Sequence, residues 1–184
     1  MTSKLFCYIA LFRAINVGGH AVVKMSELKK MFEKIGFTDV ATYIQTGNVV
    51  FSSGESDKKK LAAVIEKKFK SATGYGLKVF VLTNDKLKKA ASKNPFEPEK
   101  HANEQLCHLM FLSGKPLAVS IKELKKLEGR EYKFHVQDDV LYYAYNIKFA
   151  GKRRNIDFEK VLVVKGTSRS WKVVNKLIEL SSPK

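Results

Sequence analysis

The chain has 184 residues, of which 45% are apolar and 28% are charged, and this balance is typical of a folded globular protein rather than of a disordered chain. The length allows one large domain or two small ones, with enough residues for a buried core. With 34 basic and 18 acidic residues the formal net charge is +16, so we expect the protein to attract polyanions through its long-range field, although a solvated lysine-rich surface is the alternative.

The composition also limits where the protein works and what it can bind. No run of eighteen apolar residues occurs, and residues 1–4 lead directly into a strand-like run, so we expect neither a membrane span nor a signal peptide. The two cysteines, Cys7 and Cys107, each lie within an apolar run, which favours buried free thiols and a cytoplasmic protein. Two cysteines and four scattered histidines give no ligand spacing, so we expect no metal and no cofactor.

In the first half of the chain, alternating and helical patterns predict the order β-α-β-β-α-β. The expected strands lie near 4–13, 40–45, 48–52 and 78–82, and the expected helices near 25–35 and 56–72. Gly36 and Gly74 are suited to end these helices, and Ser56 is suited to cap the second one. Thr46, Gly47 and Asn48 are expected to form a tight hairpin turn.

The β-α-β-β-α part of this order recurs in the second half. A short helix from about Asn84 is expected to end before Pro95, and the polar residues 94–104 form an expected linker. Strands are expected near 105–112, 131–136 and 140–146, and helices near 117–127, 156–163 and 169–181. We therefore predict an α+β fold of two tandem ferredoxin-like (β-α-β-β-α) halves with antiparallel sheets, residues 1–93 and 105–184, related by duplication.

A four-stranded sheet with helices on one face leaves its other face open. We expect that open face to carry the aromatic side chains of two strands, Phe6, Tyr8 and Phe12 in the first half and Tyr142, Tyr143 and Tyr145 in the second. These faces then either bury each other or form an aromatic platform on which bases can stack.

Three segments carry candidate site residues, and the first is the loop that follows the first strand. Gly18 and Gly19 let backbone N–H groups approach a ligand, and the N-terminus of the following helix favours an anion. Arg13, Asn16 and Lys24 flank these glycines. The segment is neither a G-x-G-x-x-G fingerprint nor a P-loop, so a plain turn is the alternative.

The second segment is the hairpin with Tyr43, Gln45 and Asn48. The two amides offer paired donors and acceptors to a ligand. A structural role is the alternative for Asn48, because asparagine tolerates the left-handed backbone of turns.

The third segment, residues 166–171, is expected to open the last helix. Thr167 or Ser168 would cap this helix, which places Arg169 in its first turn, where the helix dipole disfavours a cation. Such a conflict between local rules can mark a functional residue. Trp171 stands at helical spacing with apolar residues, which favours a core position over a ligand platform.

No known catalytic arrangement is apparent. The sequence contains no G-x-S-x-G nucleophile elbow, and no cysteine–histidine or carboxylate pair stands out. Asp138 and Asp139 are expected to form a hairpin turn. The catalytic residues, and whether the protein is an enzyme, are therefore left open.

The same segments carry a family resemblance. The matching residues are Leu11–Gly19, Lys24–Met25, Gly36–Phe37, Thr42–Phe51, Asn94–Phe96, Thr167–Trp171 and Lys176–Leu177. In them the chain resembles the uncharacterised, mostly bacterial family called domain of unknown function 1697. The resemblance implies an α+β fold of two related halves and no particular activity. The family usually has glycine where Ala14 stands, asparagine at Ser170 and threonine at Val173.

These patterns favour a protein that binds an anionic ligand, a phosphate-containing small molecule, at a cluster of loops. Its expected ligand-binding residues are Arg13, Asn16, Gly18, Gly19, Lys24, Tyr43, Gln45, Asn48, Arg169 and Trp171. A nucleic-acid-binding module is one alternative, in which lysines bind phosphates and sheet aromatics stack on bases. A non-catalytic interaction or scaffold protein is the other, and the sequence leaves the oligomeric state open.

Overall fold

The computed structural model describes residues 4–16, 21–152 and 155–182. The chain divides into two compact units, one of residues 1–88 with 176–184 and one of residues 89–175. Each unit holds a four-stranded antiparallel sheet, with strand orders β2-β3-β1-β4 and β6-β7-β5-β8. Both follow the order β-α-β-β-α-β, so the predicted fold of two tandem ferredoxin-like halves is confirmed.

The first unit follows the predicted pattern closely. Its elements are β1 (Phe6–Phe12), α1 (Met25–Ile35), β2 (Thr38–Tyr43), β3 (Asn48–Ser53), α2 (Lys58–Thr73) and β4 (Val79–Thr83). The helices end at Gly36 and Gly74, whose φ angles of 97° and 80° lie in the left-handed region. Glycine adopts this conformation without strain, which confirms both as the ends of the helices.

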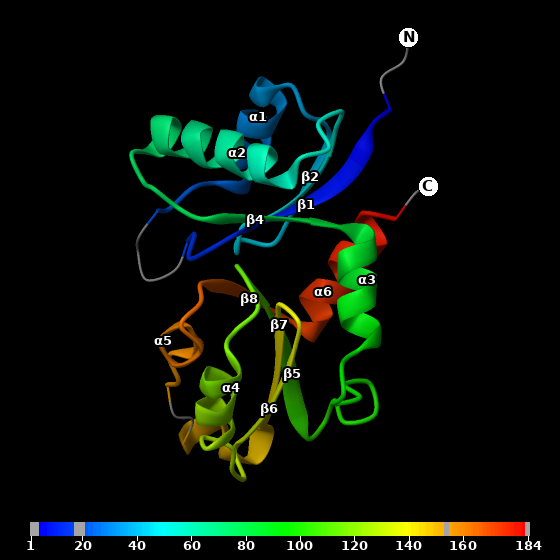
Figure 1. Cartoon of the computed structure of the whole chain (residues 1–184). Coiled ribbons are helices and arrows are strands. Elements are labelled where there is room, and N and C mark those ends of the chain that lie inside the picture. Colours follow the sequence, from blue (N-terminus) through cyan, green and yellow to red (C-terminus); the bar gives the residue numbers. More distant parts are fainter. Residues whose placement is uncertain (1–3, 17–20, 153–154, 183–184) are drawn as a thin grey trace. The chain divides into compact units, whose positions relative to one another are not determined.

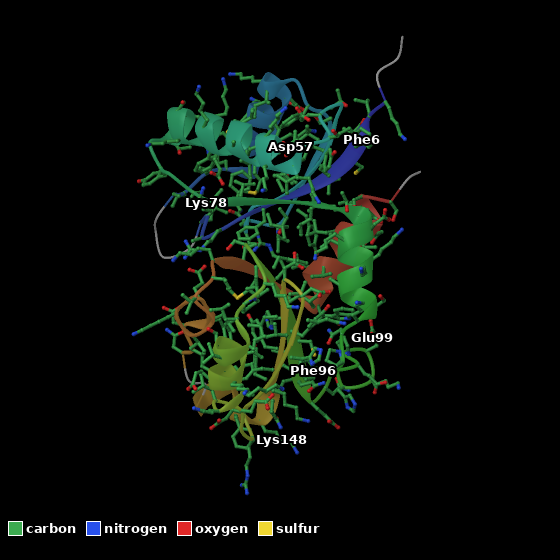
Figure 2. The ribbon with its side chains drawn as sticks, viewed as in Figure 1. Phe6, Asp57, Lys78, Phe96, Glu99 and Lys148 are labelled. Atoms are coloured by element: carbon green, nitrogen blue, oxygen red, sulfur yellow. The ribbon has the colours of Figure 1, made fainter. Side chains whose placement is uncertain are left out.

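The N-terminus of α2 corrects one prediction. Asp57, not Ser56, caps this helix, because its Oδ1 accepts hydrogen bonds from the N–H groups of Lys59 at 2.8 Å and Lys60 at 3.4 Å. Asp57 lies where α2 begins (Figure 2). Serine and aspartate are about equally good caps, so the composition alone could not place the helix start to within one residue.

Both helices of the first unit cover the same face of its sheet (Figure 1). The ring of Phe12 packs between them, with centroids 6.1 Å from Phe32 and 5.3 Å from Phe69. The expectation that Phe6, Tyr8 and Phe12 lie on the open face is therefore wrong. Alternation separates the two apolar sets of a strand but does not decide which set meets the helices, and here the bulkier aromatic set does.

The second unit repeats the arrangement with shorter helices. Its elements are β5 (Gln105–Leu112), α4 (Ala118–Lys125), β6 (Tyr132–Gln137), β7 (Val140–Asn146), the 3₁₀ helix η1 (Ile147–Lys152), α5 (Phe158–Leu162) and β8 (Gly166–Ser170). Asp138, with φ of 55°, lies in the β6–β7 turn, which confirms the predicted hairpin there.

The tyrosines of β7 do not share one face, contrary to expectation. The ring of Tyr143 packs on the helix side, 4.8 Å from Phe158. Tyr142 points to the opposite side, where its hydroxyl donates to the carbonyl of Ala90 at 2.9 Å. Successive residues of a strand point to opposite faces, so three tyrosines within four positions cannot form a single platform.

The last helix begins later than predicted. Residues 166–170 form β8, in which Arg169 pairs with Leu109 of β5 and Thr167 pairs with Phe111. The last helix, α6 (Trp171–Leu180), starts only after this strand. The expected cap at Thr167 or Ser168 is therefore wrong, and Arg169 does not oppose a helix dipole. A short polar run carries a weak strand signal, and pairing with β5 decides its conformation.

Two helices run from one unit into the other along the chain, α3 (Asn84–Ser92) and α6. Within the first unit, the Asn84 Nδ2 donates to the carbonyl of Ile178 at 2.9 Å and to the Ser181 hydroxyl at 2.7 Å. The start of α3 is thereby fixed to the end of α6. Among the described helices, none is long and apolar enough to cross a lipid bilayer.

Candidate functional site

Two loops of the first unit meet at the carboxyl end of β1. We call residues 13–16, 21–24 and 43–48 the loop cluster. Asn16 connects its parts: its Nδ2 donates to the carbonyls of Gln45 at 2.8 Å and Val23 at 3.0 Å, and its Oδ1 accepts from the Val23 N–H at 2.7 Å. The structure thus brings the first two predicted segments together. Gly18 and Gly19 lie outside the described residues.

Gly47 allows the hairpin to lie against β1. Its carbonyl accepts a hydrogen bond from the Phe12 N–H at 2.9 Å. A Cβ atom at this position would lie 2.3 Å from Ile15 Cγ2 and 2.7 Å from Phe12 Cβ, and the φ angle is +69°. Both the close approach and the left-handed backbone therefore require glycine.

Asn48, the first residue of β3, has a structural role in this hairpin. Its side chain is fully buried, and its Nδ2 donates to the carbonyl of Tyr43 at 2.9 Å and to the hydroxyl of Thr46 at 3.0 Å. Buried amides need such partners. Asn48 therefore holds the hairpin closed, and its role as a ligand-binding residue stays a prediction.

The loop cluster concentrates backbone strain. Eight of the described non-glycine residues have positive φ angles, and four of them belong to the cluster: Ala14, Asn16, Ala21 and Ile44, at 48° to 58°. For β-branched Ile44 this conformation is especially unfavourable. The φ of 58° at Ala14 is one that glycine adopts freely.

The exposed part of the cluster is basic and apolar. Residues 13–25 and 43–48 include Arg13 and Lys24 but no acidic residue. Lys24 is exposed and is the N-cap residue of α1, and its own side chain makes no capping hydrogen bond. Two apolar side chains are also exposed, Val22 at 72% and Ile44 at 44%. This surface can attract an anion and contact an apolar group beside it.

The other predicted site residues of the first unit differ in exposure. The Arg13 side chain is half-buried, and the backbone N–H of Arg13 donates to the carbonyl of Lys78 at 3.0 Å. Lys78 precedes β4 (Figure 2). Tyr43 is half-buried and Gln45 is exposed. Gln45 takes part in the loop contact through its backbone carbonyl, so its side chain faces solvent.

Arg169 and Trp171 lie in the second unit. The guanidinium of Arg169 donates through Nη1 to the Thr167 hydroxyl and to the carbonyl of Ser168, both at 2.8 Å. Burial lowers the pKa of Arg169, although the group stays charged at neutral pH. Trp171 is half-buried, and its Nε1 donates to the Glu99 carboxylate at 2.9 Å (Glu99 is labelled in Figure 2). The expectation that all three segments converge on one cleft stays a prediction.

Some features of the cluster were not predicted. The strained Ala14 and Ile44 and the exposed Val22 carry no local signal, because a left-handed alanine or isoleucine is contrary to its own preference. The sequence predicts Gly47 in the turn, but its close approach to Phe12 and Ile15 depends on the tertiary fold and could not be predicted. Within the described part of the chain, no group of three or more His, Cys, Asp or Glu side chains is arranged to hold a metal ion.

The two sheets and their helices define an α+β protein of two ferredoxin-like halves. A model of the family described as Protein of unknown function (DUF1697) matches residues 6–142, which include the whole loop cluster, and the chain belongs to this family. No curated protein matches the sequence significantly.

A solved structure supports the fold. The conserved bacterial protein SP0830 from Streptococcus pneumoniae is 21% identical in sequence and superposes with a TM-score of 0.76. The alignment covers 97% of this chain and 100% of that one. At this identity the likeness concerns the fold alone.

Proposed function

We propose that the loop cluster binds an anionic small molecule in which a phosphate group is attached to an organic body. The observation that carries this proposal is the strain: four left-handed non-glycine residues lie in two adjoining loops. Each such residue other than asparagine, which tolerates this conformation, costs about 1–3 kcal/mol, and strain of this kind concentrates at binding and catalytic sites. The bonds of Asn16 and Asn48 compensate part of that cost.

The charge of the cluster supports an anion. Lys24 and Arg13 are its ionised side chains, and these segments contain no acidic residue. The N-terminus of α1, a helix of 11 residues with Glu27 in its first turn, carries a partial positive charge beside Lys24. Phosphate is suited to this combination because it accepts several charge-assisted hydrogen bonds.

The exposed apolar side chains favour an organic phosphate over the inorganic ion. Val22 and Ile44 belong to the same loop cluster, with 72% and 44% of their surface exposed. Sites for small molecules combine apolar contact with a few polar groups that fix orientation. A nucleotide or a similar phosphorylated metabolite offers both kinds of surface.

Isothermal titration calorimetry tests this proposal. We would titrate a panel of nucleoside monophosphates, sugar phosphates and pyrophosphate into the wild type, Lys24→Ala and Lys115→Ala. A charge-assisted hydrogen bond contributes about 1.5–3 kcal/mol, so Lys24→Ala should weaken binding of the best panel member by about tenfold or more. Lys115 is exposed and lies in the second unit, and its variant removes the same charge. The proposal fails if no panel member binds, or if both variants weaken binding equally.

The exposure of Val22 and Ile44 also favours the scaffold function, in which these side chains contact another protein chain. Light scattering coupled to size-exclusion chromatography separates the two functions. The ligand-binding proposal predicts that Val22→Asp leaves the molar mass unchanged, whereas an interface formed by a second copy would dissociate in this variant.

We also propose that the protein works in the cytoplasm. Cys7 and Cys107 are both free thiols, as is usual in a reducing compartment. Cys107 is buried as expected, whereas Cys7 is exposed, so the expectation of a buried thiol is wrong there. Immunodetection in fractionated cells checks this location, and recovery in an extracellular or envelope fraction would contradict it.

A further inference from the structure

We infer that the outer surface of α1 and α2 binds the phosphate backbone of a nucleic acid, without reading its sequence. This surface, which we call the basic helical face, lies on the side of the two helices turned away from the first sheet. It is distinct from the loop cluster, and the inference does not rest on the function proposed for that cluster.

The two helices carry a large share of the protein's excess charge. They contain nine lysines and three glutamates, a net charge of +6 out of the +16 of the whole chain. The lysines are Lys29, Lys30 and Lys34 in α1, and Lys58, Lys59, Lys60, Lys67, Lys68 and Lys70 in α2. All nine are exposed.

Two of the three glutamates, Glu33 and Glu66, neutralise little of this charge. Glu33 lies 3.9 Å from the Lys29 ammonium in an exposed pair, and such pairs are weak. Glu66 binds groups at the start of β4: its carboxylate accepts from the Lys78 ammonium and from the Val79 N–H, both at 3.0 Å. It is therefore engaged with the edge of the sheet rather than with the lysines of α2.

A groove between α1 and α2 gathers three of the lysines. Its volume is about 340 Å³, and it is lined by Lys30, Lys34 and Lys68 with Glu27, Met31 and Ala72. The two helices lie side by side above the sheet (Figure 1). Over the residues that the structure describes, none of these three ammonium groups has a hydrogen-bond or ion-pair partner.

The spacing of the lysines favours an extended polyanion. α2 has 16 residues and is therefore about 24 Å long. Its lysines form two groups, residues 58–60 and 67–70, whose centres lie about 10–15 Å apart along the axis. A single small anion reaches only one group, whereas a nucleic acid carries one charge per about 3.4 Å of each strand and reaches both.

The chemistry of the face favours nucleic acid over a protein or a membrane. Neither helix contains arginine, tyrosine or tryptophan, and both phenylalanines, Phe32 and Phe69, are fully buried. Protein interfaces are enriched in aromatic residues and arginine and depleted in lysine. Binding in a membrane interface requires bulky apolar side chains, and Val64 is the one large hydrophobic residue exposed in the described helices α1 and α2.

The same composition predicts binding without sequence specificity. Arginine, which reads guanine with two hydrogen bonds, and asparagine and glutamine, which read adenine in the same way, are absent from both helices. Lysine contacts phosphate as a flexible point charge. The contacts should therefore depend strongly on salt and little on sequence.

Fluorescence anisotropy with a labelled, unstructured 20-nucleotide RNA tests the inference across a salt series. The test variant is the triple substitution Lys30→Ala, Lys34→Ala and Lys68→Ala. The matched control is Lys115→Ala, Lys122→Ala and Lys160→Ala, which removes the same charge from three exposed lysines of the second unit. Circular dichroism should show both variants folded, because exposed substitutions change stability by about 0.5 kcal/mol or less.

The wild type should bind with a log affinity that falls linearly against log salt. Each phosphate contact in a single strand contributes about 0.7 to the magnitude of this slope. The test variant lacks three lysines, so its slope should be smaller in magnitude by about 2. If affinities converge at 1 M salt, this smaller slope weakens binding about 100-fold at 0.1 M salt. The control should change affinity by less than about threefold, and a second RNA of different sequence should bind equally well.

Three results would overturn the inference. Equal losses in the test and control variants would mean that only the general field attracts RNA. A strong dependence on RNA sequence would mean that another surface reads bases. Binding of the wild type to vesicles containing phosphatidylserine, or to a poly-glutamate peptide, with no binding of RNA would assign the face to a different partner.

Discussion

At the scale of single residues, the close approach of Gly47 to β1 makes it the most sensitive position of the loop cluster. A Cβ atom there would lie 2.3 Å from Ile15 Cγ2 in a backbone with φ of +69°. Left-handed strain and overpacking each cost about 1–3 kcal/mol, so Gly47→Ala should lower the free energy of unfolding by about 2 kcal/mol or more. Urea unfolding measures this.

Gly76→Ala is the matched control for this substitution. Gly76 has no heavy atom within 4 Å of the added Cβ, and its φ is not positive. Alanine at an unstrained position reduces the entropy of the unfolded chain, so this variant should be as stable as the wild type or slightly more stable. Similar losses in both variants would contradict the role assigned to Gly47.

Ala14 offers the opposite test. Its φ of 58° costs alanine about 1–2 kcal/mol, while glycine at this site gives up about 0.4–1 kcal/mol through the entropy of the unfolded chain. Ala14→Gly should therefore leave stability unchanged or raise it by up to about 1 kcal/mol. A clear loss of stability in thermal unfolding would show that this loop is not strained at Ala14.

Tyr142 makes stability depend on alkaline pH. Burial, with smaller effects of Asp138 and Asp139, raises the pKa of its phenol from 10.0 to about 12. Below pH 10 the phenol is neutral in the folded and the unfolded protein. Above pH 10 the unfolded state loses its proton first, so the stabilisation by the buried neutral phenol is lost as pH rises towards 12.

Tyr142→Phe isolates this effect. The difference in the free energy of unfolding between wild type and variant should be constant from pH 7 to 9. Above pH 10 the wild type should lose stability relative to the variant by about 1.4 kcal/mol per pH unit. Urea titrations at pH 7, 9, 10 and 11 measure it, and a difference that stays constant to pH 11 would contradict the raised pKa.

At the scale of helices and strands, Asp57 and Ser56 give a direct test of how α2 begins. Asp57 accepts two backbone hydrogen bonds at this helix start, so Asp57→Ala should cost about 0.5–2 kcal/mol. Ser56→Ala should change stability by about 0.5 kcal/mol or less. The reverse order of the two losses would mean that the helix starts one residue earlier.

Most elements could be predicted because their signals are local. The face of α1 and the glycines after α1 and α2 follow from helical spacing and from the left-handed backbone that ends a helix. β8 could not be predicted, since Gly166–Ser170 is a polar run that becomes a strand only by pairing with β5. The orientation of β1 was also beyond local signals, because both of its faces are apolar and only the packing of Phe12 against Phe32 and Phe69 distinguishes them.

For the candidate site, the sequence indicated which segments are involved but not the structural role of each side chain. Asn16 and Asn48 were expected to face a ligand, and the structure shows their amides bonded to neighbouring loop atoms. Those bonds join residues up to 29 positions apart, which no local pattern reveals. The basic charge was visible from composition, but its concentration on α1 and α2 required the fold.

At the scale of the whole molecule, we propose two binding surfaces on the first unit, the loop cluster for a small organic phosphate and the basic helical face for a nucleic acid backbone. The two proposals predict separate effects. Lys24→Ala should weaken binding of the small molecule and leave RNA binding nearly unchanged. The substitutions at Lys30, Lys34 and Lys68 should weaken RNA binding and leave binding of the small molecule nearly unchanged. Calorimetry and anisotropy on the same three proteins check this separation.

The central proposal, that the loop cluster binds an anion, is tested most directly by a nuclear magnetic resonance titration of the ¹⁵N-labelled protein with the best phosphate ligand of the calorimetry panel. We predict saturable shifts confined to the backbone amides of residues 13–16, 21–26 and 43–48, and their loss in Lys24→Ala. Shifts that spread over the lysine-rich surface without saturating, or that saturate on other elements while this cluster stays unchanged, would contradict the proposed site.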